Sequence, residues 1–148
     1  VNQAAQELPE VSFVLIGSGE LARTRLKKLS NIYLLGRRKY GDLPAYLHNA
    51  DVGIIPFDVA GHPELVHGVH PLKLYEYLAC GLPVVSVEWE ELKNINSPAI
   101  LCQTADQFAQ GVADVVKQPH DMEAYVRYAA GQDWSSRIKT ISDFLEVE

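Results

Sequence analysis

A chain of 148 residues with 47% hydrophobic residues is long enough to bury one core and too short for two well-packed domains, so we expect a single domain over residues 1–148. The formal net charge of −6 gives no global positive field of the kind that draws a protein onto nucleic acid, so no nucleic-acid partner is expected. The sequence holds neither an apolar run of about 18 residues nor a signal peptide, which favours a cytoplasmic location.

Segments with strand-like and helix-like patterns alternate along the chain. Five short apolar or β-branched runs are expected as buried strands, over residues 11–16, 31–35, 51–57, 83–87 and 99–102. Helical periodicity is found between and after them, over residues 21–29, 43–49, 71–80 and 105–117, with a C-terminal helical segment from about residue 120 to 148. The alternation predicts an α/β fold in which helices cover both faces of a parallel sheet.

The loops at one edge of such a sheet are where a ligand is expected. Open parallel sheets bind ligands beyond the carboxyl ends of their strands. In this sequence that edge holds residues 17–19 and 36–38, the turn after Val87, and the segment 58–70, which is longer than a strand-to-helix loop needs to be. A loop of that length and position commonly carries function.

The helix over residues 71–80 has well-marked ends and two charged residues close to its start. Pro71 fits the beginning of a helix, and Gly81 is typical of its end. Lys73 and Glu76 are three residues apart, so their side chains are neighbours on the helix surface. A lysine in the first turn opposes the helix dipole at a cost of a few tenths of a kcal/mol, so a compensating interaction is expected.

Two interpretations of this pair remain open from spacing alone. Backbone amides and a lysine at a helix start can hold a phosphate or diphosphate, while a carboxylate one turn deeper offers acceptors to both hydroxyls of a ribose. The alternative is a solvated ion pair between Lys73 and Glu76, worth roughly 0.3 kcal/mol.

A longer pattern resembles a known family. The run PLKLYEYLACGLPVV is similar to the P-x-K-x-x-E-Y-x-A-x-G-x-P-V-V signature of GT-B-type glycosyltransferases, especially the retaining family four and its bacterial polysaccharide relatives. The runs VSFVLIGSGE, NIYLLG and NADVGIIPF resemble that family's second, third and fourth strands, and QDWSSR resembles the tryptophan-bearing segment before its closing helix. The resemblance implies the C-terminal, donor-binding domain, a Rossmann-like sheet with strand order 3-2-1-4-5-6.

The family's first strand would precede Val1, so the chain would begin inside the first helix. We therefore expect the strand at residues 11–16 either to pair directly with that at residues 51–57, or to leave a gap that another chain fills. The catalytic and acceptor-binding groups would lie on an N-terminal domain that is absent here, and the isolated domain is expected to be inactive. The resemblance also allows for peripheral membrane association of the complete enzyme.

The resemblance implies a role for individual residues in holding a UDP- or GDP-linked sugar. The implied donor-binding residues are Lys73, Glu76, Gly17, Gly19, Gly36, Arg37, His70 and Leu72. Among them, Lys73 would contact the diphosphate, Glu76 the ribose, and the backbone around Gly36 and Arg37 the nucleobase. Such enzymes transfer the sugar to a glycan or lipid-linked acceptor and generally need no metal, so no cofactor is expected.

One position departs from the family pattern. Retaining members often carry a second glutamate eight positions before the ribose-binding one, and Gly68 stands there in this chain. Contacts to the donor sugar are then expected from His62, Glu64, His67 or His70. The spacing of these histidines matches no familiar zinc pattern, so no metal site is expected.

Two other functions compete with the transferase. The run GSGELA fits the G-x-G-x-x-A dinucleotide fingerprint, and Arg37 and Arg38 at the end of the next strand would suit the 2′-phosphate of NADP, as in an oxidoreductase. That interpretation leaves the signature over residues 71–85 unexplained. A non-catalytic Rossmann-like module that binds or scaffolds is the third alternative.

Overall fold

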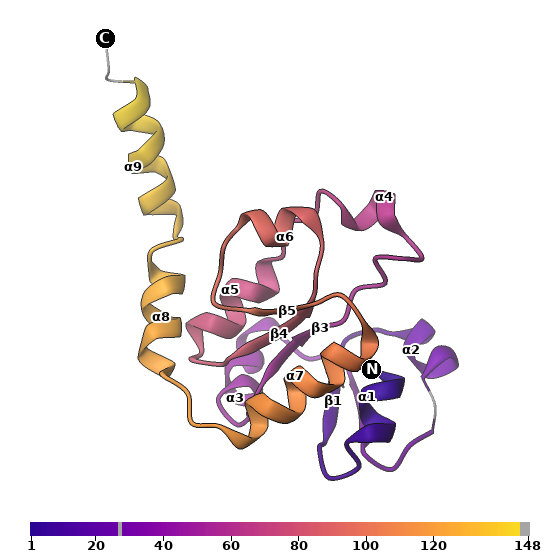
Figure 1. The fold of residues 1–148 in the computed structure, drawn as a ribbon. Coiled ribbons are helices and arrows are strands. Elements are labelled where there is room, and N and C mark those ends of the chain that lie inside the picture. The colour runs from indigo at the N-terminus through magenta and orange to yellow at the C-terminus, as the bar shows by residue number, and fades with distance from the viewer. Residues whose placement is uncertain (27, 146–148) are drawn as a thin grey trace.

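The computed structural model describes residues 1–26 and 28–145. The elements in chain order are α1 (Asn2–Glu7), β1 (Phe13–Ile16), α2 (Glu20–Arg25), β2 (Ile32–Gly36), the 3-10 helix η1 (Tyr40–Asp42), α3 (Leu43–Leu47), β3 (Gly53–Ile55), α4 (Pro63–Val66), α5 (Leu72–Ala79), β4 (Val84–Val87), α6 (Glu90–Asn94), β5 (Ile100–Cys102), α7 (Ala105–Lys117), α8 (Met122–Ala130) and α9 (Trp134–Leu145) (Figure 1). The predicted α/β class is confirmed, and each predicted strand is present. Residue 27 of the predicted helix 21–29 and residues 146–148 of the predicted tail lie outside the described residues.

The strands form two parallel sheets instead of the single sheet that the sequence suggested. β1 pairs with β2, and β3, β4 and β5 form a second sheet in that order. β1 and β3 are not paired, so the expectation that they bond directly is wrong. The side chain of Phe13 instead anchors β1 by packing against helices α1 and α7 in a shared core. The other alternative, a gap between these strands that another chain fills, stays a prediction.

The core has one cluster on each side of the three-stranded sheet, with β4 contributing to both. Val85 and Val84 are adjacent in β4 and point to opposite faces, as strand geometry requires. Val85 packs with α1 and α7, which lie side by side (Figure 1). Val84 packs with Leu74 and Leu78 of α5, both 0% exposed. Burial on both faces explains why β4 consists of three valines and one buried serine and does not alternate between apolar and polar residues.

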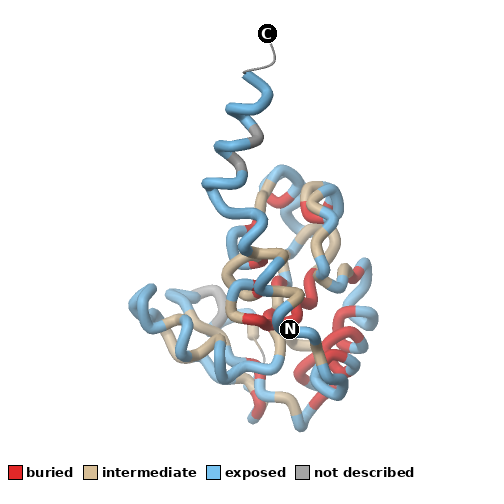
Figure 2. The backbone as a smooth tube through the Cα atoms, turned by 90° about the vertical axis from the view of Figure 1, so that its left-hand side faces the viewer, coloured by how far each residue is buried: buried red, intermediate tan, exposed pale blue. Residues whose placement is uncertain are grey.

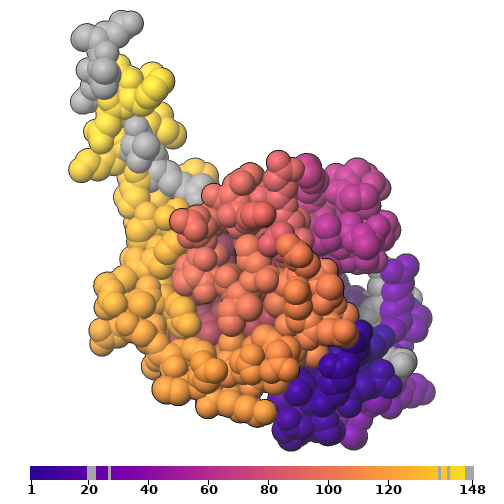
Figure 3. Space-filling model, viewed as in Figure 1, coloured from indigo at the N-terminus to yellow at the C-terminus, as the bar shows by residue number. Residues whose placement is uncertain are grey.

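The two-stranded sheet is covered less completely than predicted. Val14 of β1 is 48% exposed, and Tyr33 and Leu34 of β2 are 46% and 41% exposed. The expectation of buried strands therefore holds for β3 and β4 but is wrong for these residues of β1 and β2, and also for Ile100 of β5, which is 42% exposed. The C-terminal helix α9 is exposed along its described residues and stands out from the body (Figures 2 and 3). None of the helices in the described residues is both long and apolar enough to cross a membrane.

The helix that carries the family-like signature ends as its sequence predicts. Pro71 is the N-cap residue, and α5 ends at Ala79. Gly81 has a φ of +76°, and the amides of Gly81 and Leu82 donate to the carbonyls of Leu78 and Tyr77 at 2.9 and 3.0 Å. These two bonds form the Schellman arrangement, which needs a left-handed residue and therefore favours glycine. The chain can then turn directly from α5 into β4.

Candidate functional site

Lys73 and Glu76 lie on α5, which starts after the long loop that follows β3. In the described residues, no ion pair joins these two side chains. The ammonium nitrogen of Lys73 lies 5.8 Å from the centroid of the Phe57 ring. Glu76 instead accepts a hydrogen bond from the hydroxyl of Tyr40 at 3.0 Å. The solvated Lys73–Glu76 pair is therefore not the arrangement that the structure shows, and each charge faces a different set of neighbours.

The start of α5 offers a place for an anion. No side chain caps this helix start, and both Leu72 and Lys73 are exposed. The first amides of an α-helix have no partner within the helix, and they carry the positive end of its dipole. The lysine adds a full positive charge beside them. This arrangement can hold a phosphate or diphosphate group.

The carboxylate of Glu76 affects the pKa of three weak acids. The pKa of Tyr40 is raised by the hydrogen bond to Glu76 and by its negative charge. Burial raises the pKa of Tyr77 and of the Cys80 thiol, and the charge of Glu76 adds to both shifts. Of these three groups, the Tyr40 hydroxyl contacts the carboxylate directly, whereas Tyr77 and Cys80 are influenced by its charge. An ionised carboxylate in these surroundings keeps acceptor capacity for further hydroxyl donors.

The two predicted glycine turns meet at the end of the two-stranded sheet. The amide of Gly17 donates to the carbonyl of Gly36 at 3.0 Å, next to an irregularity in the β1–β2 register. Gly36 has a φ of +70° and Gly17 of +151°, conformations that side-chain-bearing residues rarely adopt. A Cβ atom added at either glycine would meet nothing within 4 Å. The carbonyl of Gly19 accepts a bond from the amide of Arg23 at the start of α2.

The arginines after β2 differ in how they are held. Arg38 donates from Nε to the hydroxyl of Tyr46 at 2.9 Å and from its guanidinium to the carbonyl of Arg37 at 3.0 Å. These bonds fix the loop 37–39 against α3, on which Tyr46 lies. Arg37 itself is exposed. Its predicted contact with a nucleobase, through the backbone, stays a prediction.

Two histidines of the loop 58–70 contact carboxylates at the start of α6. His67 lies 2.7 Å from Glu90, and Nδ1 of His70 lies 3.0 Å from Glu91. Nε2 of His70 is 2.8 Å from the hydroxyl of Tyr75, so both ring nitrogens of His70 have partners. A sugar donor that binds either ring nitrogen of His70 would have to displace Glu91 or Tyr75 from it. Among the described residues, no three histidine, cysteine, aspartate or glutamate side chains are placed to hold a metal ion.

An aromatic pair that the sequence analysis did not single out supports the same loop. The rings of Phe57 and Trp89 are stacked, with centroids 5.2 Å apart and planes inclined by 25°. The indole nitrogen of Trp89 donates to the carbonyl of Val69 at 3.0 Å. These contacts join the start and the end of the loop, and Phe57 also lies beneath Lys73. Glu90 and Glu91, which follow Trp89, are the sequence signal that could have predicted the start of α6.

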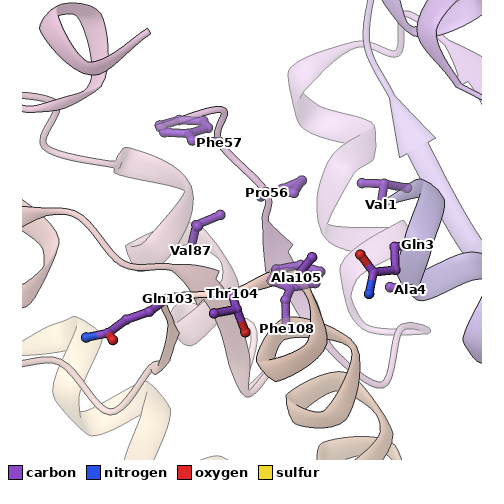
Figure 4. A pocket seen from close by; sticks show the side chains of 10 residues that line it. All are labelled: Val1, Gln3, Ala4, Pro56, Phe57, Val87, Gln103, Thr104, Ala105 and Phe108. Atoms are coloured by element: carbon purple, nitrogen blue, oxygen red, sulfur yellow. The ribbon is translucent and has the colours of Figure 1, made fainter. Parts of the chain in front are cut away.

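Two hollows adjoin Phe57, and neither is lined by Lys73 or Glu76. One of about 290 Å³ is lined by Phe57, Asp58, His62, Leu65, Val66 and Val69. It includes His62 of the predicted sugar-contacting residues but not Glu64 or His67. The other, of about 200 Å³, lies between α1 and the starts of the loops after β3, β4 and β5 (Figure 4). It is lined by Val1, Gln3, Ala4, Pro56, Phe57, Val87, Gln103, Thr104, Ala105 and Phe108. The predicted diphosphate and ribose residues thus lie outside both.

Comparison with known proteins identifies the family. The family model described as Glycosyl transferases group 1 matches residues 1–118, which include β1 to β5 and the whole of α5. A protein of Bacillus subtilis (strain 168), which carries the provisional name teichuronic acid biosynthesis glycosyltransferase TuaH, is 28% identical over 159 residues. That alignment covers 100% of this chain and 39% of the relative, so the chain spans well under half of the relative's length. The NADP interpretation has no comparable support, and the chain belongs to the group 1 glycosyl transferases.

Proposed function

We propose that this chain binds the nucleoside diphosphate part of a sugar donor, UDP- or GDP-linked, for transfer of the sugar to a glycan or lipid-linked acceptor. The name of the Bacillus subtilis relative supports a role in polysaccharide synthesis. The proposal includes a separate acceptor-binding domain, no cofactor besides the donor, and a cytoplasmic location with peripheral membrane association of the complete enzyme.

One observation carries the proposal: Lys73 and Glu76 are neighbours on α5 but do not pair with each other. Lys73 stands beside an uncapped helix start, whereas Glu76 accepts a hydrogen bond from the hydroxyl of Tyr40. A helix surface that holds a cation without an ion pair among the described residues, one turn from a carboxylate with spare acceptor capacity, fits a ligand with an anionic group next to a diol. A ribonucleoside diphosphate is such a ligand, because its diphosphate is joined directly to the ribose.

The same arrangement would assist the chemistry of transfer. Negative charge develops on the leaving diphosphate as the bond to the sugar breaks. The first amides of α5 are held by the helix before that charge appears, and the Lys73 ammonium adds a positive charge beside them, so both would stabilise the transition state more than the ground state. The groups that position the acceptor would come from the other domain.

Titration calorimetry of the 148-residue chain with UDP, GDP and NADP tests the proposal. We expect UDP or GDP to bind, and Lys73→Ala to weaken that binding about tenfold or more, because hydrogen bonds to charged groups contribute roughly 1.5–3 kcal/mol. Lys117→Ala removes the same charge from the far end of α7 and is the matched control, with affinity expected to stay unchanged.

Other outcomes would favour the alternatives. A chain that prefers NADP over both diphosphates would support the oxidoreductase interpretation. A chain that binds none of the three ligands would support the scaffold. Equal losses in Lys73→Ala and Lys117→Ala would show a general effect of net charge and would contradict the assignment of the diphosphate to α5.

A further inference from the structure

We infer that Tyr40 is a positioning residue that orients the Glu76 carboxylate for a ribose diol, an inference that rests on the proposed function. Tyr40 lies in η1, in the loop after β2, whereas Glu76 lies in α5. The two residues are 36 positions apart, and the Tyr40 hydroxyl donates to Oε1 of Glu76 at 3.0 Å. The contact therefore joins the predicted nucleobase loop to the predicted ribose residue.

The hydrogen bond is the feature that fixes Tyr40 at this place. Its side chain is 74% exposed, so burial in a core does not account for its position. In the described residues no ring stacking involves Tyr40, although other aromatic side chains near the site are stacked. A phenol on the surface that reaches a single carboxylate oxygen is placed by that oxygen.

The geometry leaves room for the ligand on the same carboxylate. A carboxylate offers about four lone-pair sites, of which Tyr40 uses one on Oε1. The other oxygen and the second lone pair of Oε1 stay available to the two ribose hydroxyls. With one oxygen held, the plane of the carboxylate is set before the nucleotide arrives, and less conformational freedom is lost on binding.

Tyr40 can act as a donor throughout the neutral pH range. The Tyr40 phenol contacts Glu76, and the charge of Glu76 also reaches the phenol of Tyr77 and the thiol of Cys80; the pKa of all three groups is raised. The nearest cation on the same helix, Lys73, forms no ion pair with Glu76 in the described part of the chain. Among the described residues, the hydroxyl of Tyr40 is thus the one hydrogen-bond donor on this carboxylate.

The consequence is a selectivity for ribose over sugars that lack its hydroxyls. Removing the Tyr40 hydroxyl should lower the affinity for ligands that hydrogen-bond to the Glu76 carboxylate and leave the affinity for other ligands unchanged. Calorimetric titration of the 148-residue chain with UDP, GDP and their 2′,3′-dideoxy forms separates these cases. We expect Tyr40→Phe to lower the affinity for whichever of UDP and GDP binds by about three- to tenfold. Its affinity for the dideoxy form of that nucleotide should change by less than about twofold.

Two further variants test whether the effect of the Tyr40 hydroxyl depends on Glu76. In a Glu76→Ala background, Tyr40→Phe should have no additional effect, because its partner is already gone. Tyr33→Phe removes a hydroxyl from another exposed tyrosine, on β2, and should bind both ligand forms as the unchanged chain does. Urea unfolding of each variant confirms that the fold is kept.

The inference is overturned by equal losses for the ribose and dideoxy ligands, which would show a general structural role. It is also overturned if Tyr40→Phe binds ribonucleotides as well as, or better than, the unchanged chain, since a hydroxyl that competes with ribose would have that effect. If the unchanged chain binds neither UDP nor GDP, the proposed function fails and takes this inference with it. If it binds but Tyr40→Phe is neutral, the inference alone fails.

Discussion

Substitution of Asn31 is expected to detach the part of the molecule that carries β1 and β2. Asn31 is 8% exposed, and its side-chain nitrogen donates to the carbonyls of Ala5, Leu8 and Val11 at 2.9, 3.0 and 3.0 Å. These carbonyls lie at the end of α1 and in the connection to β1. One amide group thus fixes α1, which packs on α7, to the chain segment that leads into β2.

The expected size of the effect follows from the hydrogen bonds. An amide nitrogen has two hydrogens, so the three contacts amount to two full bonds shared among three acceptors. Each bond contributes about 1 kcal/mol net, and a buried carbonyl left without a donor costs about 1–3 kcal/mol, although the carbonyl of Leu8 would keep its bond from the amide of Val11. Asn31→Ala should therefore lower the free energy of unfolding by about 2–4 kcal/mol.

Asn31→Asp tests whether the amide donates to these carbonyls. A carboxylate would direct an acceptor at the same three carbonyl oxygens, so at pH 7 it should destabilise the fold more than alanine does. The same surroundings would raise the pKa of the new carboxyl above that in the unfolded chain. Compared with the unchanged chain at the same pH, the variant should then be least destabilised below about pH 4 and increasingly destabilised as the pH rises through the raised pKa.

Urea unfolding followed by circular dichroism measures these changes. Asn49→Ala is the control, because Asn49 makes a single exposed hydrogen bond to the carbonyl of Ala45, and a change within about 0.5 kcal/mol is expected. The reasoning is refuted if Asn31→Ala lies as close to the unchanged chain as the control does, or if Asn31→Asp is no worse than Asn31→Ala at pH 7.

Two further predictions concern the contact between β3 and α5 and the stability of the chain at alkaline pH. Gly53→Ala should lower the free energy of unfolding by about 1–3 kcal/mol, because the new Cβ would overlap the ring of Tyr77, whereas Gly68→Ala, where the space is open, should change it little. Burial raises the pKa of the Cys80 and Cys102 thiols, so the unfolded chain loses these protons first and stability should fall as the pH rises above about 8.5. Urea unfolding checks both, and a stability that is constant from pH 7 to 10 would contradict the second.

The elements that the sequence predicted well are those with local signals. The bounds of α7 agree with the expected residues 105–117, because Thr104 caps the helix start by accepting a bond from the amide of Gln107. For α5, Pro71 and Gly81 mark the ends in the same way. Short helices such as α4 and α6 have no such length or periodicity, and their stability comes from packing that a sequence does not display.

The features that the sequence did not predict are non-local. An apolar run indicates a strand but not its partner, so the separation of the two sheets could not be foreseen. The expectation of strands covered on both faces failed for β2, because Tyr33 and Leu34 are as apolar as residues that a second layer would bury. Likewise Lys73 and Glu76 were found from their spacing, but their partners Phe57 and Tyr40 are brought to them by the fold.

The predicted donor-binding residues belong to two parts of the molecule that no strand pairing joins in the described residues. Gly17 and Gly36 end β1 and β2, whereas Lys73 and Glu76 lie on α5, next to the three-stranded sheet. The parts are held together by the core around α1 and, at the site, by the Tyr40–Glu76 hydrogen bond. A nucleotide that contacts both parts would add a third connection, so its affinity would depend on how firmly the first two hold. For this reason the residues that set donor affinity would include Asn31, which lies in the core and touches no predicted ligand.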